Sequence, residues 1–223
     1  MILAIDTSTQ WIGLAIYTES RVIYEKTWRT SQRHTIELAP AVSQMFLESG
    51  KSISDIQAIA IALGPGSFTS LRIGLAFAKG LALAQHIPLI GIPTLDILAY
   101  MQPLSDLPLI CILQAGRLRL AAAHYINNNN QWQVSRDPYS TTAKELEASI
   151  VCTTIISGEL TRADRKTLLR KWKNIILTSP ANSLRRSAYL AEMAWHRLNS
   201  GQSDNPALLI PIYLHTINTI SND

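Results

Sequence analysis

The chain has 223 residues, of which 47% are apolar and 16% are charged, and its formal net charge is +4. So few charged residues leave unusually apolar surface exposed in a folded protein, which is typical of a protein that binds a partner. No stretch predicts a membrane span, the N-terminus lacks the basic region of a signal peptide, and both cysteines lie in apolar segments, so we expect a cytoplasmic protein with reduced thiols.

The first half of the chain predicts the element order β-β-β-α-β-α-β-α. Apolar residues recur at helical spacing from 34 to 49, and Gly50 is a natural stop. The segment 56–63 is apolar at nearly every position, which indicates a strand that is covered on both faces. We expect strands at 2–6, 12–17, 21–28, 56–63 and 87–92, and helices at 34–49, 69–85 and 94–101.

Two prolines and several turn-forming residues at 101–108 mark a boundary, after which the same order recurs. We expect strands at 109–114, 120–126, 132–136, 153–157 and 174–177, and helices at 142–149, 163–172 and 182–199. A duplicated unit of this order predicts the α/β fold of actin, hexokinase and Hsp-seventy-type ATPases (the ASKHA fold), in which two lobes face each other across a cleft. The expected lobes are 1–104 and a reduced 105–223, whose tail could pack back on the first.

Enzymes of this fold hold phosphate groups with the hairpin turn that opens each lobe, and they need glycine where the backbone approaches the phosphates. In the first turn Asp6 is present, but Ser8 occupies the expected glycine position. In the second turn Gln114 stands where a carboxylate would be useful, although Gly116 is present. No Gly-Gly adenosine loop follows. These weakened elements argue against a competent nucleotide site, and we interpret Asp6 as a turn-stabilising residue rather than a catalytic acid.

The segment GPGSFTSLR at 64–72 joins a predicted strand to a predicted helix. It lacks the lysine of a Walker phosphate loop, and Pro65 removes one backbone donor. We expect it to turn the chain into the helix and to cap that helix with its hydroxyls, using Gly64, Pro65, Gly66, Ser67 and Thr69. An anion at the helix start is the alternative. The five histidines have no metal-ligand spacing, so no metal site is expected.

The segment 70–85 is apolar nearly all round its predicted helix, which indicates cover on more than one side. The helix is either buried within the monomer or pairs with helix 34–49 to form an exposed apolar surface that docks on another protein. The second interpretation predicts a partner interface made by His34, Leu38, Val42, Met45, Phe46, Leu71, Ile73, Gly74, Leu75, Phe77, Ala78 and Leu81.

Five segments resemble the TsaB (YeaZ) family: ILAIDTST at 2–9, HTIELAPAV at 34–42, GPGSFTSLRIGLAFAKGLA at 64–82, IGIPTLDILA at 90–99 and PIYLH at 211–215. The resemblance implies an ASKHA fold with a decayed nucleotide site, a heterodimer with the transferase TsaD through helices of the first lobe, and a homodimer without that partner. It also implies recruitment of the ATPase TsaE. The metal and the catalysis belong to TsaD, and the complex transfers a threonylcarbamoyl group to the adenosine next to the tRNA anticodon.

On this resemblance the chain is a pseudo-enzyme, a scaffold for tRNA modification without a cofactor of its own; a nucleotide at the partner interface stays open. The alternative is a small-molecule kinase or ATPase of the actin-like class. A third hypothesis is direct contact with tRNA, because 162–173 carries six basic residues against one acid, although a solvated helix face would also explain the segment. The candidate contacts are Arg162, Arg165, Lys166, Arg170 and Lys171.

Three positions depart from the family's usual pattern. Ser70 replaces a glycine near the helix start, Gln114 begins Gln-Ala-Gly in place of Asp-Ala-Arg, and His215 replaces an arginine in the tail. The three changes bear on the approach of a partner, on a carboxylate at the second turn, and on a cationic contact to the partner or to TsaE.

Overall fold

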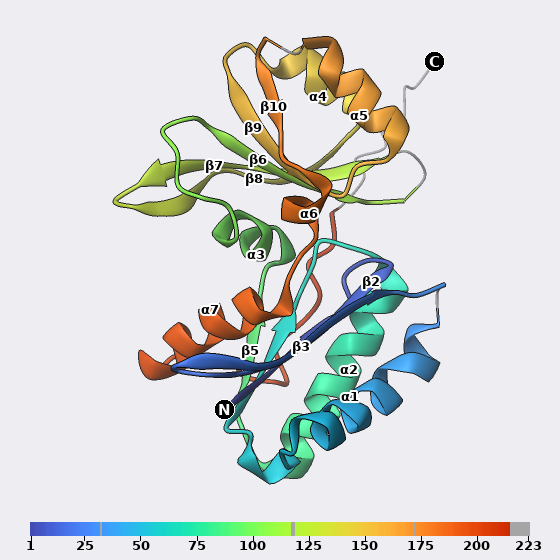
Figure 1. Ribbon diagram of the computed structural model, residues 1–223, viewed down its shortest axis with the longest axis vertical. Coiled ribbons are helices and arrows are strands. Elements are labelled where there is room, and N and C mark those ends of the chain that lie inside the picture. The colour runs from blue at the N-terminus through green and yellow to red at the C-terminus, as the bar shows by residue number, and fades with distance from the viewer. Residues whose placement is uncertain (32, 117–118, 172, 215–223) are drawn as a thin grey trace.

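The computed structural model describes residues 1–31, 33–116, 119–171 and 173–214. Two five-stranded sheets lie one above the other along the long axis of the molecule (Figure 1). Each sheet has helices packed on it, so both are buried from two sides. The duplicated element order predicted from the sequence is therefore found in space as two α/β layers. A lobe boundary between 104 and 105 stays a prediction. The departure at His215 lies outside the described residues.

The first sheet contains, in spatial order, β3 (Arg21–Arg29), β2 (Trp11–Thr18), β1 (Ile2–Asp6), β4 (Ala58–Ala62) and β5 (Leu89–Ile92). The strands β1, β2 and β3 pair antiparallel, whereas β1, β4 and β5 run parallel. The helices α1 (His34–Ser49) and α2 (Phe68–Gln85) cover one face, with η1 (Ile53–Asp55) between α1 and β4, and α7 (Ser187–Asn199) covers the other face (Figure 1).

Strand β4 confirms that the segment 56–63 is covered on both faces, since all five residues of the strand are buried. Ile59 and Ile61 pack in the core beneath α1 and α2. Ala58 and Ala60 pack on the opposite face against Leu190 of α7. Successive residues of a strand point to opposite faces, so the isoleucines lie on one face of β4 and the alanines on the other. The small alanine side chains let α7 lie close to the sheet.

The second sheet contains, in spatial order, β10 (Ile175–Leu177), β9 (Thr154–Gly158), β6 (Leu109–Gln114), β7 (Leu120–Asn128) and β8 (Gln131–Thr141). The helices α4 (Ala143–Ser149) and α5 (Arg162–Leu168), the latter followed by η2 (Leu169–Lys171), lie on its outer face (Figure 1). The other face is covered by α3 (Thr94–Tyr100), whose Leu95 and Leu98 are fully buried against β6 and β7.

The two sheets exchange helices. By sequence order α3 follows the strands of the first sheet, yet it packs on the second; α7 follows the strands of the second sheet, yet it packs on the first. The segments joining these helices to their own strands therefore cross between the layers. This exchange couples the two halves of the chain and could not be read from helical periodicity.

Two predicted helices are shorter than expected. The segment 182–199 forms a short α6 (Pro180–Ser183) and then α7, because Leu184 and Arg186 have extended backbone conformations. The segment 163–172 is helical only as far as Leu168 and continues as the 3-10 turn η2. The extended break before α7 places Arg185 at the junction of the two sheets.

The residues after α7 return to the first sheet. The Asp204 backbone N–H donates to Leu89 O at 3.0 Å, and an Asp204 carboxylate oxygen accepts from Gly91 N at 2.8 Å. Further along, Ile212 N donates to Leu63 O at 2.8 Å. These three hydrogen bonds hold the segment 204–212 against β5 and the loop that follows β4.

Candidate functional site

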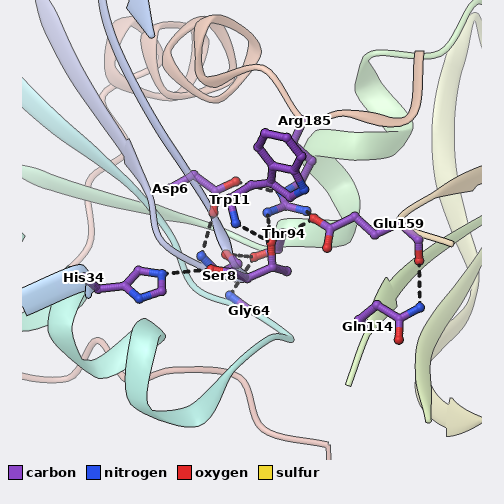
Figure 2. A network of polar contacts seen from close by, with 10 residues as sticks. Asp6, Ser8, Trp11, His34, Gly64, Thr94, Gln114, Glu159 and Arg185 are labelled. Carbon is purple, nitrogen blue, oxygen red and sulfur yellow. Dashed lines mark hydrogen bonds and ion pairs between the residues drawn. The ribbon is translucent and has the colours of Figure 1, made fainter. Parts of the chain in front are cut away.

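The side chain of Arg185 joins the two sheets where a cleft was expected. Its Nε donates to Asp6 Oδ2 at 2.7 Å, Nη1 is paired with Glu159 Oε1, and Nη2 donates to Thr9 Oγ1 at 3.1 Å (Figure 2). Asp6 ends β1 of the first sheet, whereas Glu159 directly follows β9 of the second. These four residues, which we call the Arg185 cluster, bring three distant segments of the chain to one point.

The cluster is almost closed to solvent, and its charges are matched closely in space. Arg185 is 3% exposed and Asp6 is 4% exposed. Burial alone lowers the pKa of Arg185, but the carboxylates of Asp6 and Glu159 outweigh it and raise that pKa above its usual value. Thr9 Oγ1 donates to Glu159 Oε1 at 2.8 Å, which completes the ring of contacts. A guanidinium group that stays charged therefore lies directly against the Asp6 carboxylate.

The turn after β1 is folded back on itself and on its neighbours. Asp6 Oδ1 accepts from Ser8 N at 2.8 Å, which stabilises the turn as the sequence predicted for this aspartate. Ser8, at the position where glycine was expected, is fully buried, and its Oγ lies 2.7 Å from Thr94 Oγ1. These contacts turn the Ser8 side chain into the protein interior.

The glycine-rich loop packs directly against that turn. Gly64 N donates to Thr94 Oγ1 at 2.9 Å, Thr94 N donates to Gly64 O at 2.7 Å, and Ser67 N donates to Ser8 O at 2.7 Å. A Cβ atom on Gly66 would lie 2.1 Å from Ser8 O, closer than any real contact. Glycine is required here because loop and turn touch backbone to backbone.

The loop does not cap α2 with its hydroxyls, so that prediction is wrong. Ser67 is the N-cap residue, but no side-chain oxygen accepts from the first turn of the helix. Its Oγ instead accepts from Ser70 Oγ at 2.9 Å, and Thr69 is exposed. Pro65 is buried beside Gly64, whose φ of +105° favours glycine.

The second turn is held by the amide of Gln114. Its Nε2 donates to Glu159 O at 3.2 Å and to Asp164 Oδ2 at 3.1 Å (Figure 2 shows the first of these bonds). A carboxylate at 114 could donate neither bond and would lie beside the charge of Asp164. Glutamine at 114, where the resemblance led us to expect aspartate, therefore fits the contacts of this chain. Gly116, in the same turn, is exposed and has a φ of +79°.

His34 and Ser70 extend the buried contacts toward α1 and α2. His34 Nε2 lies 2.9 Å from Thr9 O, and since a carbonyl can only accept, this nitrogen carries the proton. Thr7 Oγ1 donates to Ser70 O at 2.9 Å. Ser70 is buried, so its side chain, at the position where the resemblance to TsaB led us to expect glycine, is turned into the monomer.

The predicted partner-interface residues divide into two groups. Eight are buried inside the monomer, so their side chains cannot contact a partner directly in this conformation: His34, Leu38, Val42, Met45, Leu71, Gly74, Leu75 and Ala78. The remaining four are half-buried at the helix surface: Phe46, Ile73, Phe77 and Leu81. Burial within the monomer explains much of the apolar periodicity, while the interface itself stays a prediction.

The five candidate RNA-contacting residues lie together on α5 and η2, on the outer face of the second sheet. Within the described ranges, no group of three or more histidine, cysteine, aspartate or glutamate side chains could hold a metal ion. Nor does any helix in that part of the chain have the length and apolar character needed to cross a membrane.

Sequence reasoning missed Glu159, Arg185 and Thr94 as members of this site. Asp6 was found because an acid at a strand end is a local signal. Arg185 carries no such signal, since it lies in a pair of arginines between two helices and reaches Asp6 across 179 positions.

Residues 27–196 match the model of the family described as TsaD, tRNA N6-adenosine threonylcarbamoyltransferase. The chain belongs to the TsaD family. The matched stretch begins within β3 and ends within α7, so it includes β4 and β5 of the first sheet, all five strands of the second sheet, α3 and most of α7.

Curated relatives confirm the resemblance to TsaB within the TsaD family. The Escherichia coli K12 protein named tRNA threonylcarbamoyladenosine biosynthesis protein TsaB is 42% identical over 100 residues, which are 44% of this chain and 42% of that one. TsaB of Bacillus subtilis is 38% identical over 98 residues, or 44% and 43% of the two chains. A tRNA N6-adenosine threonylcarbamoyltransferase of Solidesulfovibrio magneticus is 36% identical over 105 residues, or 40% and 28%. The matches thus span less than half the length of these relatives.

Solved structures confirm the ASKHA fold. YeaZ from Pseudomonas aeruginosa superimposes with a TM-score of 0.75 at 22% identity, covering 96% of this chain and 99% of that one. The ROK hexokinase of Thermus thermophilus gives a TM-score of 0.50 at 10% identity over 88% and 99% of the two chains. At these identities the likeness concerns the fold alone.

Proposed function

We propose that the chain is a non-catalytic subunit that binds the TsaD transferase and supports the formation of threonylcarbamoyladenosine next to the tRNA anticodon. The Arg185 cluster is the observation that carries the non-catalytic part of this proposal. The buried Arg185 guanidinium lies against the Asp6 carboxylate. An active ASKHA enzyme would need this position for phosphate and a cation. The names of the TsaB relatives support the assignment to this pathway.

The outer surface of α1 and α2 supports the docking part of the proposal. The two helices lie side by side (Figure 1). Several of their apolar side chains are exposed to solvent. Ile36 is 72% exposed, Leu47 75% and Leu83 75%. Exposed apolar side chains on adjacent helices are typical of a protein interface. The half-buried Phe46 and Phe77 would add aromatic area to it.

The other partners follow from the same proposal. TsaE joins through the complex, tRNA is reached with the transferase, and a second copy of the chain covers the helices when TsaD is absent. A nucleotide, if bound, lies at the interface with TsaD rather than in the cleft. On this proposal the protein acts in the cytoplasm.

The test is assembly with purified TsaD, measured by size-exclusion chromatography, together with threonylcarbamoyl transfer to tRNA. Leu47→Glu with Leu83→Glu should weaken assembly by more than about tenfold, since a charge in an apolar interface is costly. Val151→Glu is the matched control, because Val151 is 85% exposed on the second lobe, and it should assemble normally. The proposal would be overturned if the wild-type chain did not assemble with TsaD, or if the isolated chain hydrolysed ATP.

A further inference from the structure

Three cations on α5 and η2 have no partner in the described part of the chain. Arg162, Lys166 and Arg170 are exposed, and none of them makes a hydrogen bond or ion pair there. They follow one another at four-residue spacing, which places them on one side of a helical segment. Like charges at this spacing repel each other, so the arrangement costs stability unless an anion binds.

The neighbouring cations hold the segment in place. Arg165 Nη2 donates to Thr178 O at 2.9 Å, and Lys171 Nζ lies 3.4 Å from both Ala148 O and Ile150 O. These contacts tie α5 and η2 to the loop after β10 and to the end of α4. Of the five candidate residues, two are therefore structural and three are free to bind a ligand.

The one acid in the segment faces elsewhere. Asp164 accepts from Thr161 Oγ1 at 2.6 Å and from Gln114 Nε2 at 3.1 Å, so its charge is used to cap α5 and to hold the second turn. It does not neutralise the exposed cations. Within the segment 162–171 the exposed charged side chains are therefore all cations.

A shallow, open depression lies along this side of the helical segment. Arg162, Arg165, Lys166, Leu169 and Arg170 line an open hollow of about 460 Å³ on the outer face of the second sheet. Cations that follow one another along an open surface suit an extended polyanion. A single exposed leucine, Leu169, gives little apolar area for insertion into a lipid surface.

We propose that this basic face, defined as Arg162, Lys166 and Arg170, binds the phosphate backbone of RNA. The identity of that RNA as the tRNA substrate rests on the proposed function. Contacts to phosphate fix position without reading sequence, so the face orients the tRNA while base recognition lies elsewhere in the complex. It lies on the second lobe, away from the proposed docking helices α1 and α2 (Figure 1).

The experiment measures binding of a labelled tRNA transcript to the full chain by fluorescence anisotropy between 50 and 200 mM KCl. The variant is Arg162→Gln, Lys166→Gln, Arg170→Gln. The control is Arg21→Gln, Lys26→Gln, Lys51→Gln, which changes the net charge equally on the first lobe. Loss of three phosphate contacts should lower the slope of log K against log salt by about 2 to 3 and weaken binding at low salt by about tenfold or more. The control should bind like the wild type.

Equal loss of affinity in both triple variants would show a general charge effect and overturn the proposal. Co-sedimentation of the wild type with phosphatidylserine vesicles, without tRNA binding, would overturn it in favour of a membrane surface. Assembly with TsaD is measured in parallel. If the triple variant of the basic face assembles with TsaD but no longer binds tRNA, the inference is supported. If the wild type binds tRNA but does not assemble with TsaD, the proposed function is wrong, whereas the inference that the basic face binds RNA still holds.

Discussion

Arg185 Nε lies 2.7 Å from Asp6 Oδ2, although 179 positions of sequence separate the two residues. The contact joins the end of β1 to the extended break between α6 and α7, and the pairing with Glu159 adds the second sheet. The negative charge of Asp6, at the turn after β1, is thereby paired with a cation from the same chain. The same contact fixes the two halves of the molecule relative to each other.

Arg185→Met should lower the free energy of unfolding by about 3–5 kcal/mol, because it leaves the buried Asp6 and the partly buried Glu159 without their cation. Urea denaturation followed by circular dichroism measures the change. Arg186→Met is the matched control. Arg186 pairs with Glu25 but its side chain is 53% exposed, so its loss should cost less than about 1 kcal/mol. Adding Asp6→Asn and Glu159→Gln to Arg185→Met should restore part of the lost stability; equal losses in the two arginine variants would contradict this account.

Gln114→Glu should destabilise the second lobe by about 1–3 kcal/mol. The change removes both bonds donated by the Gln114 amide and adds a negative charge beside Asp164. Gln131→Glu, on the exposed end of β8, should leave the urea midpoint nearly unchanged. A Gln114→Glu protein as stable as the wild type would mean that the second turn tolerates the acid.

Gly66→Val should impair folding, and with it docking to TsaD, without removing any catalytic group. Its side chain would overlap Ser8 O, a backbone atom that cannot move without breaking the turn after β1. Gly80→Ala is the control, because a Cβ there meets nothing within 4 Å and alanine favours the α2 helix by roughly 0.5–1 kcal/mol. Thermal unfolding and size-exclusion chromatography give the two readouts. Normal assembly of a folded Gly66→Val protein would count against the tight contact of loop and turn.

The stability of the protein should depend on pH through Asp96. Burial raises the pKa of this carboxyl above 3.8, and the hydrogen bond from Tyr125 Oη at 2.7 Å opposes that rise only in part. The folded state therefore holds the proton more tightly than the unfolded chain. The stabilisation is fully present below pH 3.8 and is lost as the pH rises through the raised pKa.

Asp96→Asn removes this titration while keeping an oxygen that can accept from Tyr125. The free energy of unfolding of the variant minus that of the wild type should increase with pH above about 4 and then level off. Urea denaturation between pH 3.5 and 7 measures the difference. A difference that is constant across this range would contradict the assignment to Asp96.

Local patterns predicted most of the fold. Strand 2–6 and helix 34–49 match β1 and α1 residue for residue, because apolar spacing and the stop at Gly50 are properties of short segments. The same patterns could not say which side of α2 the sheet would cover. Leu71 and Leu75 face the core, while Leu83 faces solvent, and only the packed sheet decides between them.

The candidate site was predicted in part. The aspartate turn and the glycine loop were recognised, yet their mutual contact was not, since Gly66 and Ser8 meet only through tertiary packing. Arg185 and Glu159 were missed for the same reason. An ion pair across the whole chain leaves no spacing for a sequence pattern to detect.

The exchange of helices between the sheets has a consequence for synthesis on the ribosome. The face of β4 that carries Ala58 and Ala60 is covered by Leu190 of α7, and α7 is translated long after the strands that it covers. Until α7 emerges, the first sheet presents an uncovered apolar face to chaperones and to other nascent chains. Its native packing must therefore form late, when the second half of the polypeptide is already outside the exit tunnel.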